Sequence, residues 1–273
     1  MESVTRILEN SYKMKELDSQ LETCEKCGEP IQKIVELLGV KRRVPIMCRC
    51  KKKELKDKEI KDLNLEKQER LKSLIKNSLM EKSFFEKTFE NWDFNKGQKT
   101  MYNLGIKYAN NFKKIKQEGL GLLVYGNPGN GKSYLSFAIA NELLKKQQPV
   151  ICISINGLLE RIRETYSRWG REGETEILKS LGNADLLVID DLGVEQSTDW
   201  SVTKIYNIID SRYRNKLPLI VTTNHTLDDL KELYGERTYD RLIEMCTPIQ
   251  NNGQSIRKEK AKDNTKILKE ILG

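Results

Sequence analysis

The sequence predicts an α/β protein in which helices cover both faces of a parallel sheet, preceded by a small helical domain. Its strands are indicated by four short apolar runs at residues 121–125, 149–155, 185–190 and 217–223. Amphipathic stretches separate these runs, and strands that alternate with helices form parallel sheets that are buried on both faces. The small domain is indicated by four cysteines that fall within 27 residues near the N-terminus.

The composition excludes a membrane protein. Charged residues make up 32% of the chain, and no apolar run approaches the roughly 20 residues that a bilayer span requires. The first residues mix acidic and basic side chains and lack the continuous apolar segment of a secretory signal. We therefore expect a cytoplasmic protein.

We predict three segments, at residues 1–82, 83–99 and 100–273. They correspond to a metal-binding helical domain, an aromatic linker and a nucleotide-binding domain. Within the first domain we expect a helix over 1–20, the cysteine module over 21–52 and a long charged helix over 53–82. Four apolar side chains share one face of that charged helix: Ile60, Leu63, Leu71 and Leu74.

The net charge of +8 originates in one segment. Fifteen basic and seven acidic side chains lie between Lys41 and Lys82, an excess equal to that of the whole chain. Such a block favours an anionic partner such as nucleic acid. Two structural alternatives stay open: a solvated, charged helix, and basic residues that offset the negative charge of a metal–thiolate cluster.

Four cysteines form two close pairs, C-x2-C and C-x-C: Cys24, Cys27, Cys48 and Cys50. Zn²⁺ binds four soft ligands tetrahedrally, and two close pairs are the usual way to supply them. Gly28 eases the turn that follows the first pair. Because disulfides are rare in a reducing cytoplasm, we predict a zinc site. Cys152 and Cys246 lie in apolar, strand-like segments and are predicted to be core residues.

A glycine-rich segment follows the first apolar run and precedes a predicted helix. It reads G-x4-G-K-S, the pattern of a phosphate-binding loop: Gly126, Asn127, Pro128, Gly129, Asn130, Gly131, Lys132 and Ser133. The glycines let backbone N–H groups point at a phosphate, and the helix N-terminus adds positive potential. We predict that Lys132 reaches the β- and γ-phosphates and that Ser133 coordinates Mg²⁺. Tyr134 belongs to the same predicted nucleotide site.

Polar residues end two later apolar runs. Asp190 and Asp191 close the run at 185–190, where an acidic strand end would lie beside the phosphate-binding loop. Asp190 is predicted to hold Mg²⁺ and Asp191 to act as general base on water, a role that Glu fills more often. Asn224 ends the run at 217–223, where its amide can bond the γ-phosphate and the attacking water.

The combination of these motifs resembles AAA+ ATPases. The segments GNPGNGKS, LLVIDDLG and TTN, followed by GERTYDRL and NNGQSIR, resemble the DnaC/DnaI-type bacterial or phage helicase loaders and their IstB-like relatives over residues 84–260. The resemblance implies that ATP is the nucleotide and that the chain is an ATPase. It also implies that Arg241 is an arginine finger acting on a neighbouring subunit, with Arg237 as its rival, and that Arg257 is a sensor arginine acting within its own subunit. Surface salt bridges are the alternative role for these arginines.

The first domain distinguishes members within that group. Loaders of the DnaI kind carry a cysteine-bearing zinc domain before the ATPase, whereas IstB transposition ATPases usually lack one. The resemblance therefore implies an ATP-dependent loader that places a replicative DnaB-type helicase hexamer on single-stranded DNA. It further implies that the zinc domain docks on the helicase and that subunits self-associate through the arginine finger.

Residues 156–181 are predicted to form an amphipathic helix. Its packing side holds Leu158, Leu159, Ile162, Tyr166 and Trp169. The opposite side holds four arginines: Arg161, Arg163, Arg168 and Arg171. The resemblance implies that this region meets single-stranded DNA, which suits arginines that follow phosphates. Solvated arginines are the alternative.

The linker concentrates aromatic side chains: Phe84, Phe85, Phe89, Trp92 and Phe94. The resemblance implies that the segment packs beside the adenine, and a hydrophobic contact between domains is the alternative.

Three functional alternatives remain. The first is an IstB-like transposition helper that binds duplex DNA and a transposase. The second is a small-molecule kinase, against which Asn224, the paired aspartates and the late arginines argue. The third is an adaptor that binds ATP but scarcely hydrolyses it, which Asp191 in place of Glu leaves open.

Overall fold

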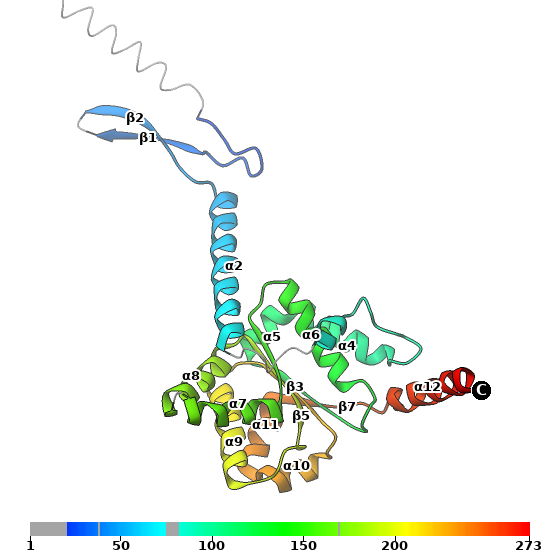
Figure 1. The fold of residues 1–273 in the computed structure, drawn as a ribbon. Coiled ribbons are helices and arrows are strands. Elements are labelled where there is room, and N and C mark those ends of the chain that lie inside the picture. Colours follow the sequence, from blue (N-terminus) through cyan, green and yellow to red (C-terminus); the bar gives the residue numbers. More distant parts are fainter. Residues whose placement is uncertain (1–20, 38, 75–81, 169) are drawn as a thin grey trace, which may run out of the picture. The chain divides into compact units, whose positions relative to one another are not determined.

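The computed structural model describes residues 21–37, 39–74, 82–168 and 170–273. The chain forms two compact units that divide between Leu63 and Asn64. We call them the cysteine unit and the sheet unit (Figure 1). The sequence analysis ended the first domain at residue 82, whereas residues 64–74 belong to the sheet unit. The helix predicted over 1–20 lies outside the described residues.

The cysteine unit contains a β-hairpin, which the sequence analysis did not predict. Strand β1 (Gln32–Leu37) pairs antiparallel with β2 (Val40–Pro45), and Gly39 supports the turn with a φ of 74°. Both strands are largely exposed, so they lack the alternation that marks a half-buried strand. The hairpin lies inside the predicted cysteine module, so the small first domain contains strands as well as a helix.

Helix α2 (Arg49–Leu74) begins inside the predicted cysteine module and crosses the division between the units. Its predicted apolar face is not buried at Ile60 or Leu63, which are 47% and 64% exposed. The side chains of Leu71 and Leu74 lie outside the described residues.

Most described side chains of α2 are exposed and charged, as in a solvated helix. Two of the exceptions lie in the sheet unit, where Gln68 is buried and bonds the backbone of Val150, and Lys67 pairs with Asp185.

The sheet unit contains five parallel strands in the order β4-β5-β6-β3-β7 (Figure 1). They are β3 (Gly121–Tyr125), β4 (Val150–Ser154), β5 (Leu186–Leu192), β6 (Leu219–Thr223) and β7 (Cys246–Gln250). The first four confirm the predicted strands and their parallel arrangement. Strand β7 was indicated only by the apolar setting of Cys246, and it pairs with β3 at the sheet edge.

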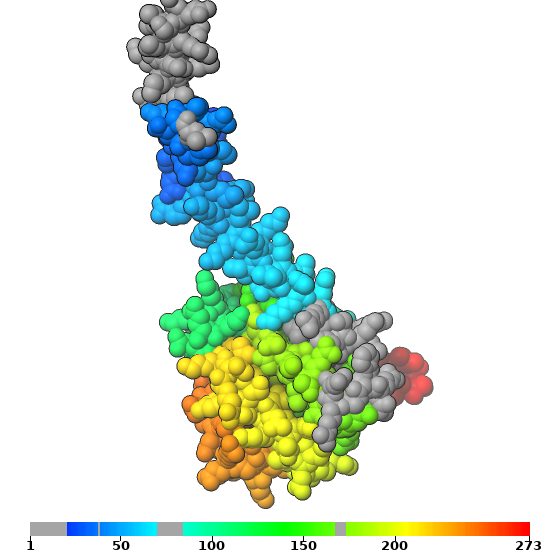
Figure 2. All heavy atoms as spheres, turned by 90° about the vertical axis from the view of Figure 1, so that its left-hand side faces the viewer, coloured from blue at the N-terminus to red at the C-terminus, as the bar shows by residue number. Residues whose placement is uncertain are grey.

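Side chains alternate between the two faces of the sheet along each buried strand. Both faces are therefore apolar, and helices cover each of them. Leu123 contributes to one core and its neighbours Leu122 and Val124 to the other. The first core is completed by α7 (Ile155–Arg168), α8 (Gly170–Asn183), α9 (Asp199–Arg214), α10 (Leu227–Tyr234) and α11 (Glu236–Met245). Figure 2 shows α9 (yellow) beside α10 and α11 (orange) on one face of this unit.

The opposite face is covered by helices from the first part of the sheet unit: α3 (Lys82–Glu86), α4 (Lys99–Asn110), α5 (Phe112–Glu118) and α6 (Lys132–Lys145). Phe84, Phe89 and Trp92 of the predicted linker are buried in this core. The aromatic segment therefore packs within the sheet unit. The last helix, α12 (Ile256–Leu272), has no buried residue. Among the described helices, none is long and apolar enough to cross a membrane.

Candidate functional site

The predicted phosphate-binding loop connects strand β3, which lies between β6 and the edge strand β7, to the N-terminus of α6. Gly126 has a φ of 140°, and a Cβ atom there would lie 2.4 Å from the carbonyl oxygen of Asn251. Gly129 has a φ of 79°, a conformation that favours glycine. The loop thus places its backbone N–H groups and the positive end of α6 at the carboxyl edge of the sheet, where anions bind.

The Lys132 ammonium lies inside this loop. Its Nζ donates hydrogen bonds of 2.8 Å to the carbonyl oxygens of Gly126 and Asn127, and the residue is only 4% exposed. Burial lowers the pKa of Lys132, while the negative charges of Asp191 and Asp190 oppose that effect. The amine is therefore held between the loop and the two aspartates, where it can bind a phosphate.

The two aspartates lie at the carboxyl end of β5, next to the phosphate-binding loop. Asp190 is buried, and burial raises its pKa. The hydroxyl of Thr222 bonds its Oδ1 at 2.5 Å, and the Ser133 side chain is near enough to lower its pKa. The structure thus brings together the two residues predicted to hold Mg²⁺. Carboxylate and hydroxyl oxygens are ligands that Mg²⁺ accepts.

Asn224 follows the last residue of β6. Thr223 pairs with Tyr125, the residue that precedes the phosphate-binding loop, so Asn224 lies at the same edge of the sheet as Gly126. The Asn224 side chain is exposed. It is placed to meet a bound ligand from the side of β6.

Arg257, near the start of α12, approaches the same loop from within the chain. The N–H group of Ile256 donates to the carbonyl oxygen of Gly129 at 2.9 Å, and a Cβ atom on Gly129 would lie 3.4 Å from Arg257. The positive charge of Arg257 also contributes to the lowered pKa of Lys132. The structure therefore places Arg257 beside the loop in the same subunit.

Arg241 lies elsewhere, between α11 and α9. It forms an ion pair with Asp210 and donates a 2.5 Å hydrogen bond to the hydroxyl of Tyr206. Its guanidinium also lies over the ring of Tyr206. Arg237, one turn earlier, is exposed and lies 5.1 Å from the centre of the same ring. Arg237 and Arg241, the two predicted finger arginines, thus lie where α11 packs against α9. The described partners of Arg241 are residues of α9.

A cavity of about 310 Å³ opens beside the phosphate-binding loop. It is lined by Trp92, by Met101 of α4, by Gly131 of the loop, by Tyr134 of α6 and by Ile256 of α12. The rings of Trp92 and Tyr134 pack edge to face at 5.3 Å, and the Tyr134 hydroxyl donates to the carbonyl oxygen of Thr88. This apolar, aromatic cavity is suited to a nucleotide base. The sequence analysis identified Trp92 and Tyr134 for this region but not Met101.

The four predicted metal-binding cysteines converge in the cysteine unit. Their sulfur atoms all lie within 4.8 Å of one another, and those of Cys48 and Cys50 are 3.1 Å apart. A tetrahedral zinc site with Zn–S bonds of about 2.3 Å needs sulfur atoms roughly 3.8 Å apart. Backbone N–H groups of Lys26 and Cys27 lower the pKa of Cys24 to about 6. Thiolate formation is thereby favoured at Cys24, whereas the hydrogen bonds of Cys48 and Cys24 raise the pKa of Cys50 to about 12. The convergence of four sulfur atoms is the donor set that Zn²⁺ prefers.

The predicted amphipathic helix at 156–181 is two helices, α7 and α8, rather than one. Leu158, Leu159 and Ile162 are buried as expected. Tyr166 is 43% exposed, so its predicted packing role is wrong. The side chains of Arg168 and Arg171 and all of Trp169 lie outside the described residues.

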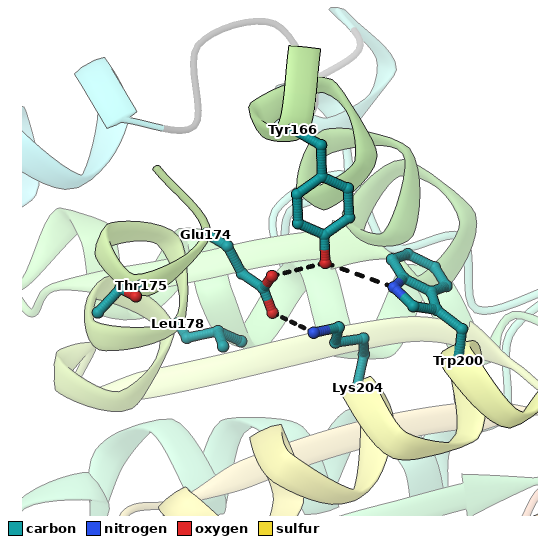
Figure 3. Close-up of a pocket in the computed structure, with 6 residues that line it drawn as sticks. All are labelled: Tyr166, Glu174, Thr175, Leu178, Trp200 and Lys204. Atoms are coloured by element: carbon teal, nitrogen blue, oxygen red, sulfur yellow. Dashed lines mark hydrogen bonds and ion pairs between the residues drawn. The ribbon is translucent and has the colours of Figure 1, made fainter. Parts of the chain in front are cut away.

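The surface where α7, α8 and α9 meet carries an aromatic and charged cluster (Figure 3). The Tyr166 hydroxyl points toward Glu174 and Trp200, and Lys204 forms an ion pair with Glu174. The Arg163 guanidinium lies 4.7 Å from the centre of the Trp200 ring. Arg161 pairs with Glu164 at 2.8 Å. No pattern in the sequence predicted that Trp200 belongs to this cluster. Trp200 lies on α9, which follows the aspartates in the chain, and only the tertiary structure brings α9 beside α7.

Comparison with known proteins identifies relatives of the sheet unit. The model of IstB-like ATP binding proteins matches residues 51–264. Replicative helicase loader DnaC of Escherichia coli (strain K12) is 36% identical over 117 residues, which are 43% of this chain and 47% of that protein. DnaC of Buchnera aphidicola subsp. Baizongia pistaciae (strain Bp) is 30% identical over 148 residues, 54% of this chain and 59% of that protein. The chain thus spans about half the length of the curated relatives it matches.

A crystal structure of the DnaC helicase loader superposes with a TM-score of 0.55 at 26% identity. It covers 63% of this chain and all of that chain. The resemblance inferred from the motifs is therefore confirmed. Because the family match extends over most of the sequence and includes the phosphate-binding loop and both aspartates, the chain belongs to the IstB-like ATP binding proteins.

Proposed function

We propose that this chain is an ATP-dependent loader that places a replicative DnaB-type helicase on single-stranded DNA. The observation that carries this proposal is the 36% identity over 117 residues to a replicative helicase loader. The geometry of the nucleotide site supports it, because the loop, the aspartates and Arg257 converge at one edge of the sheet.

In this proposal ATP binds with its phosphates on residues 126–133 and its base in the cavity lined by Trp92 and Tyr134. Ser133 and Asp190 hold Mg²⁺, which neutralises charge on the phosphates. Lys132 exchanges its bonds to loop carbonyls for bonds to the β- and γ-phosphates. Arg257 adds positive charge from the same subunit.

Hydrolysis requires a group that orients and polarises water. Asp191 takes this role, with Asn224 bonding the water and the γ-phosphate from β6. The side chain of Asp191 is one methylene shorter than the more common Glu, so its reach depends on the backbone that presents it. An ATPase should hydrolyse ATP faster than its Lys132→Ala variant does. An adaptor that only binds ATP should hydrolyse it no faster than that variant.

Self-association places an arginine of one subunit at the ATP of its neighbour. Arg241, or Arg237 beside it, supplies this finger. Arg237 is exposed, whereas Arg241 would have to exchange its contacts with Asp210 and Tyr206 for the phosphate.

DNA binding is assigned to the α7–α9 surface. Arg161, Arg163, Arg168 and Arg171 would follow the phosphates of a single strand. The Arg163–Trp200 stack supports this assignment, because aromatic rings and guanidinium groups are the surfaces on which unpaired bases stack.

The cysteine unit is assigned to the helicase. Zn²⁺ held by its four cysteines stabilises a small unit that has little core of its own. The hairpin exposes Leu37 and Val40 next to a run of basic residues, Lys41, Arg42 and Arg43. An apolar tip with basic flanks suits a protein surface that is apolar and acidic.

The test is size-exclusion chromatography with light scattering of the full chain mixed with the replicative helicase of its host. We expect co-elution to require ATP and to be reduced in Lys132→Ala. Leu37→Asp should abolish co-elution. Glu118→Gln is the control and should leave ATP-dependent co-elution unchanged. Single-stranded DNA should bind the complex, and Arg163→Ala should weaken that binding. Absence of any helicase complex, with binding of duplex DNA and a transposase instead, would favour the IstB-like transposition helper.

A further inference from the structure

The end of β5 departs from a regular strand at the two aspartates. Ile189 pairs with Val221 and Leu192 pairs with Thr223, so Asp190 and Asp191 together face Thr222 on β6. This is a β-bulge, in which two residues of one strand oppose one residue of its neighbour. Asp191 lies in the left-handed region with a φ of 56°. For a residue other than glycine this conformation costs about 1 kcal/mol.

The bulge changes where Asp191 points. In a regular strand successive side chains face opposite sides of the sheet, so only one of the two carboxylates would face the phosphate-binding loop. Here the charges of both Asp191 and Asp190 act on the Lys132 ammonium. The bulge places Asp190 and Asp191 together opposite Thr222, at the end of β5 beside the β6 residues that lead to Asn224.

One buried hydroxyl contacts both halves of this bulge. Thr222 is fully buried, and its Oγ1 donates a 2.5 Å hydrogen bond to Oδ1 of Asp190. The same oxygen accepts a 3.0 Å hydrogen bond from the backbone N–H of Asp191. A hydroxyl can do both at once because it has one proton to donate and lone pairs to accept.

We propose that Thr222 is a positioning residue that holds Asp190 and Asp191 in the arrangement that binds Mg²⁺·ATP and orients water. Its donated bond fixes the rotamer of the carboxylate that holds the metal. Its accepted bond satisfies the N–H group of the strained residue and so keeps Asp191 turned toward the loop. This inference rests on the proposed ATPase function, and it adds a residue that touches neither nucleotide nor metal.

The test compares Thr222→Val with Thr222→Ser in the full chain. Val keeps the shape and the preference for a strand but removes both bonds, whereas Ser keeps the hydroxyl. Thr165→Val is the matched control, because Thr165 is also buried and its hydroxyl bonds a carbonyl oxygen in α7 at 2.6 Å, away from the nucleotide site. Three quantities are measured: kcat and KM for ATP, the Mg²⁺ concentration that half-saturates binding of a fluorescent ATP analogue, and binding of that analogue in EDTA.

We expect Thr222→Val to lower kcat by about 10- to 100-fold and to raise the Mg²⁺ requirement by about tenfold, as for other groups that orient metal ligands. Binding in EDTA should stay within about twofold of the wild type, and Thr222→Ser should recover most of kcat. Thr165→Val should change none of these quantities.

Wild-type kcat and Mg²⁺ requirement in Thr222→Val would overturn the inference. So would a Thr222→Ser variant as impaired as Thr222→Val, because the hydroxyl would then not be the cause. If the wild type hydrolyses no more ATP than Lys132→Ala, the proposed ATPase function fails, and the Mg²⁺ requirement of analogue binding alone then decides the role of Thr222.

Discussion

Asn130 and Asn251 exchange hydrogen bonds across 121 residues of sequence. The side-chain amide of Asn130 donates to the carbonyl oxygen of Asn251 at 2.6 Å, and the amide of Asn251 donates to the carbonyl oxygen of Asn130 at 3.0 Å. Both residues are buried. Asn130 belongs to the phosphate-binding loop and Asn251 follows the edge strand β7. The pair therefore joins the loop to the segment that leads to Arg257.

Replacing Asn251 by Ala should weaken nucleotide binding. The change removes two hydrogen bonds of the Asn251 side chain, the one donated to the Asn130 carbonyl oxygen and the one accepted from the Gly253 N–H group. It leaves a buried carbonyl oxygen of the loop without its partner, which costs about 1–3 kcal/mol. We expect the Kd for a fluorescent ATP analogue to rise roughly tenfold. The control is Asn215→Ala, because Asn215 bonds a carbonyl oxygen at the exposed end of α9. Equal affinities for both variants would contradict the proposed support of the loop.

Replacing Asp190 by Asn should stabilise the protein in the absence of metal as pH rises. Burial raises the pKa of this carboxyl above its ordinary 3.8, so the folded state holds the proton more tightly than the unfolded state. The free energy of unfolding therefore falls as pH rises from 3.8 through the folded pKa, and Asn removes that part of the fall.

The measurement is thermal denaturation in EDTA at pH 5 and pH 7.5. We expect the gain in stability from Asp190→Asn to be larger at the higher pH, because burial raises the pKa of Asp190. Asp228→Asn, at an exposed position of α10, is the control. A gain that does not change with pH would contradict the prediction.

Arg212 should be essential for stability of the sheet unit. Its fully buried guanidinium donates to the carbonyl oxygens of Leu181 and Pro218 at 2.6 Å and of Ala184 at 3.1 Å. Burial lowers its pKa to about 9. Arg212→Ala leaves these carbonyl groups without a donor and opens a cavity, so we expect a loss of about 3–5 kcal/mol in urea denaturation.

The neighbouring Arg214 supplies the control for that experiment. Its side chain is 64% exposed and pairs with Asp210 at 2.8 Å. Exposed ion pairs contribute about 0–1 kcal/mol, so Arg214→Ala should change stability little. Similar losses for the two variants would show that the buried bonds of Arg212 are not the cause.

A finger arginine that acts on a neighbouring subunit can be identified by mixing inactive variants. Lys132→Ala and Arg241→Ala should each lose ATPase activity, and their mixture should recover part of it, because some sites combine Lys132 of one subunit with Arg241 of another. Lys132→Ala mixed with Arg257→Ala should recover none, because both residues belong to one site.

The same experiment distinguishes Arg241 from Arg237. Recovery with Arg237→Ala and not with Arg241→Ala would assign the finger to Arg237. Arg241→Ala should also reduce stability, because Tyr206 loses the guanidinium that donates to its hydroxyl and Asp210 keeps only its pair with Arg214. Absence of recovery for both mixtures would contradict a finger on this face.

The cysteine cluster should bind one Zn²⁺ per chain. Elemental analysis should find one equivalent in the wild type and none in Cys48→Ser, and Co²⁺ should give the intense visible absorption of a tetrahedral thiolate site. Cys152→Ala is the control, because Cys152 is buried in β4 of the sheet unit and is not one of the four converging cysteines. Full zinc content in Cys48→Ser would contradict the assignment.

The nucleotide site could be predicted because its chemistry is local in sequence. The segment from Gly126 to Ser133 carries its own turn geometry and its helix start, and the apolar run before Asp190 determines that this carboxylate ends a strand. Parallel strands share one carboxyl edge, so the convergence of these motifs follows from the strand pattern alone.

The hairpin β1–β2 and strand β7 were harder to predict from the sequence. The hairpin is exposed on both faces and has no strict alternation, and β7 is a short edge strand interrupted by Pro248. Tyr166 shared the helical spacing of the buried Leu158 and Ile162, yet it lies beyond the point where α7 is covered by the sheet. Periodicity predicts which side chains share a face, and packing decides how far along the helix that face is buried.

The phosphate-binding loop, the paired aspartates, the four-cysteine cluster and the α/β class could be predicted from the amino-acid sequence, since each depends on residues close together in the chain. Only the tertiary structure decided that Thr222 supports both aspartates, that Asn251 supports the loop, and that Arg163 meets Trp200. These contacts join residues from 31 to 121 positions apart. Their geometry depends on strand register, a bulge and helix packing, which are properties of the assembled core and leave no local pattern in the sequence.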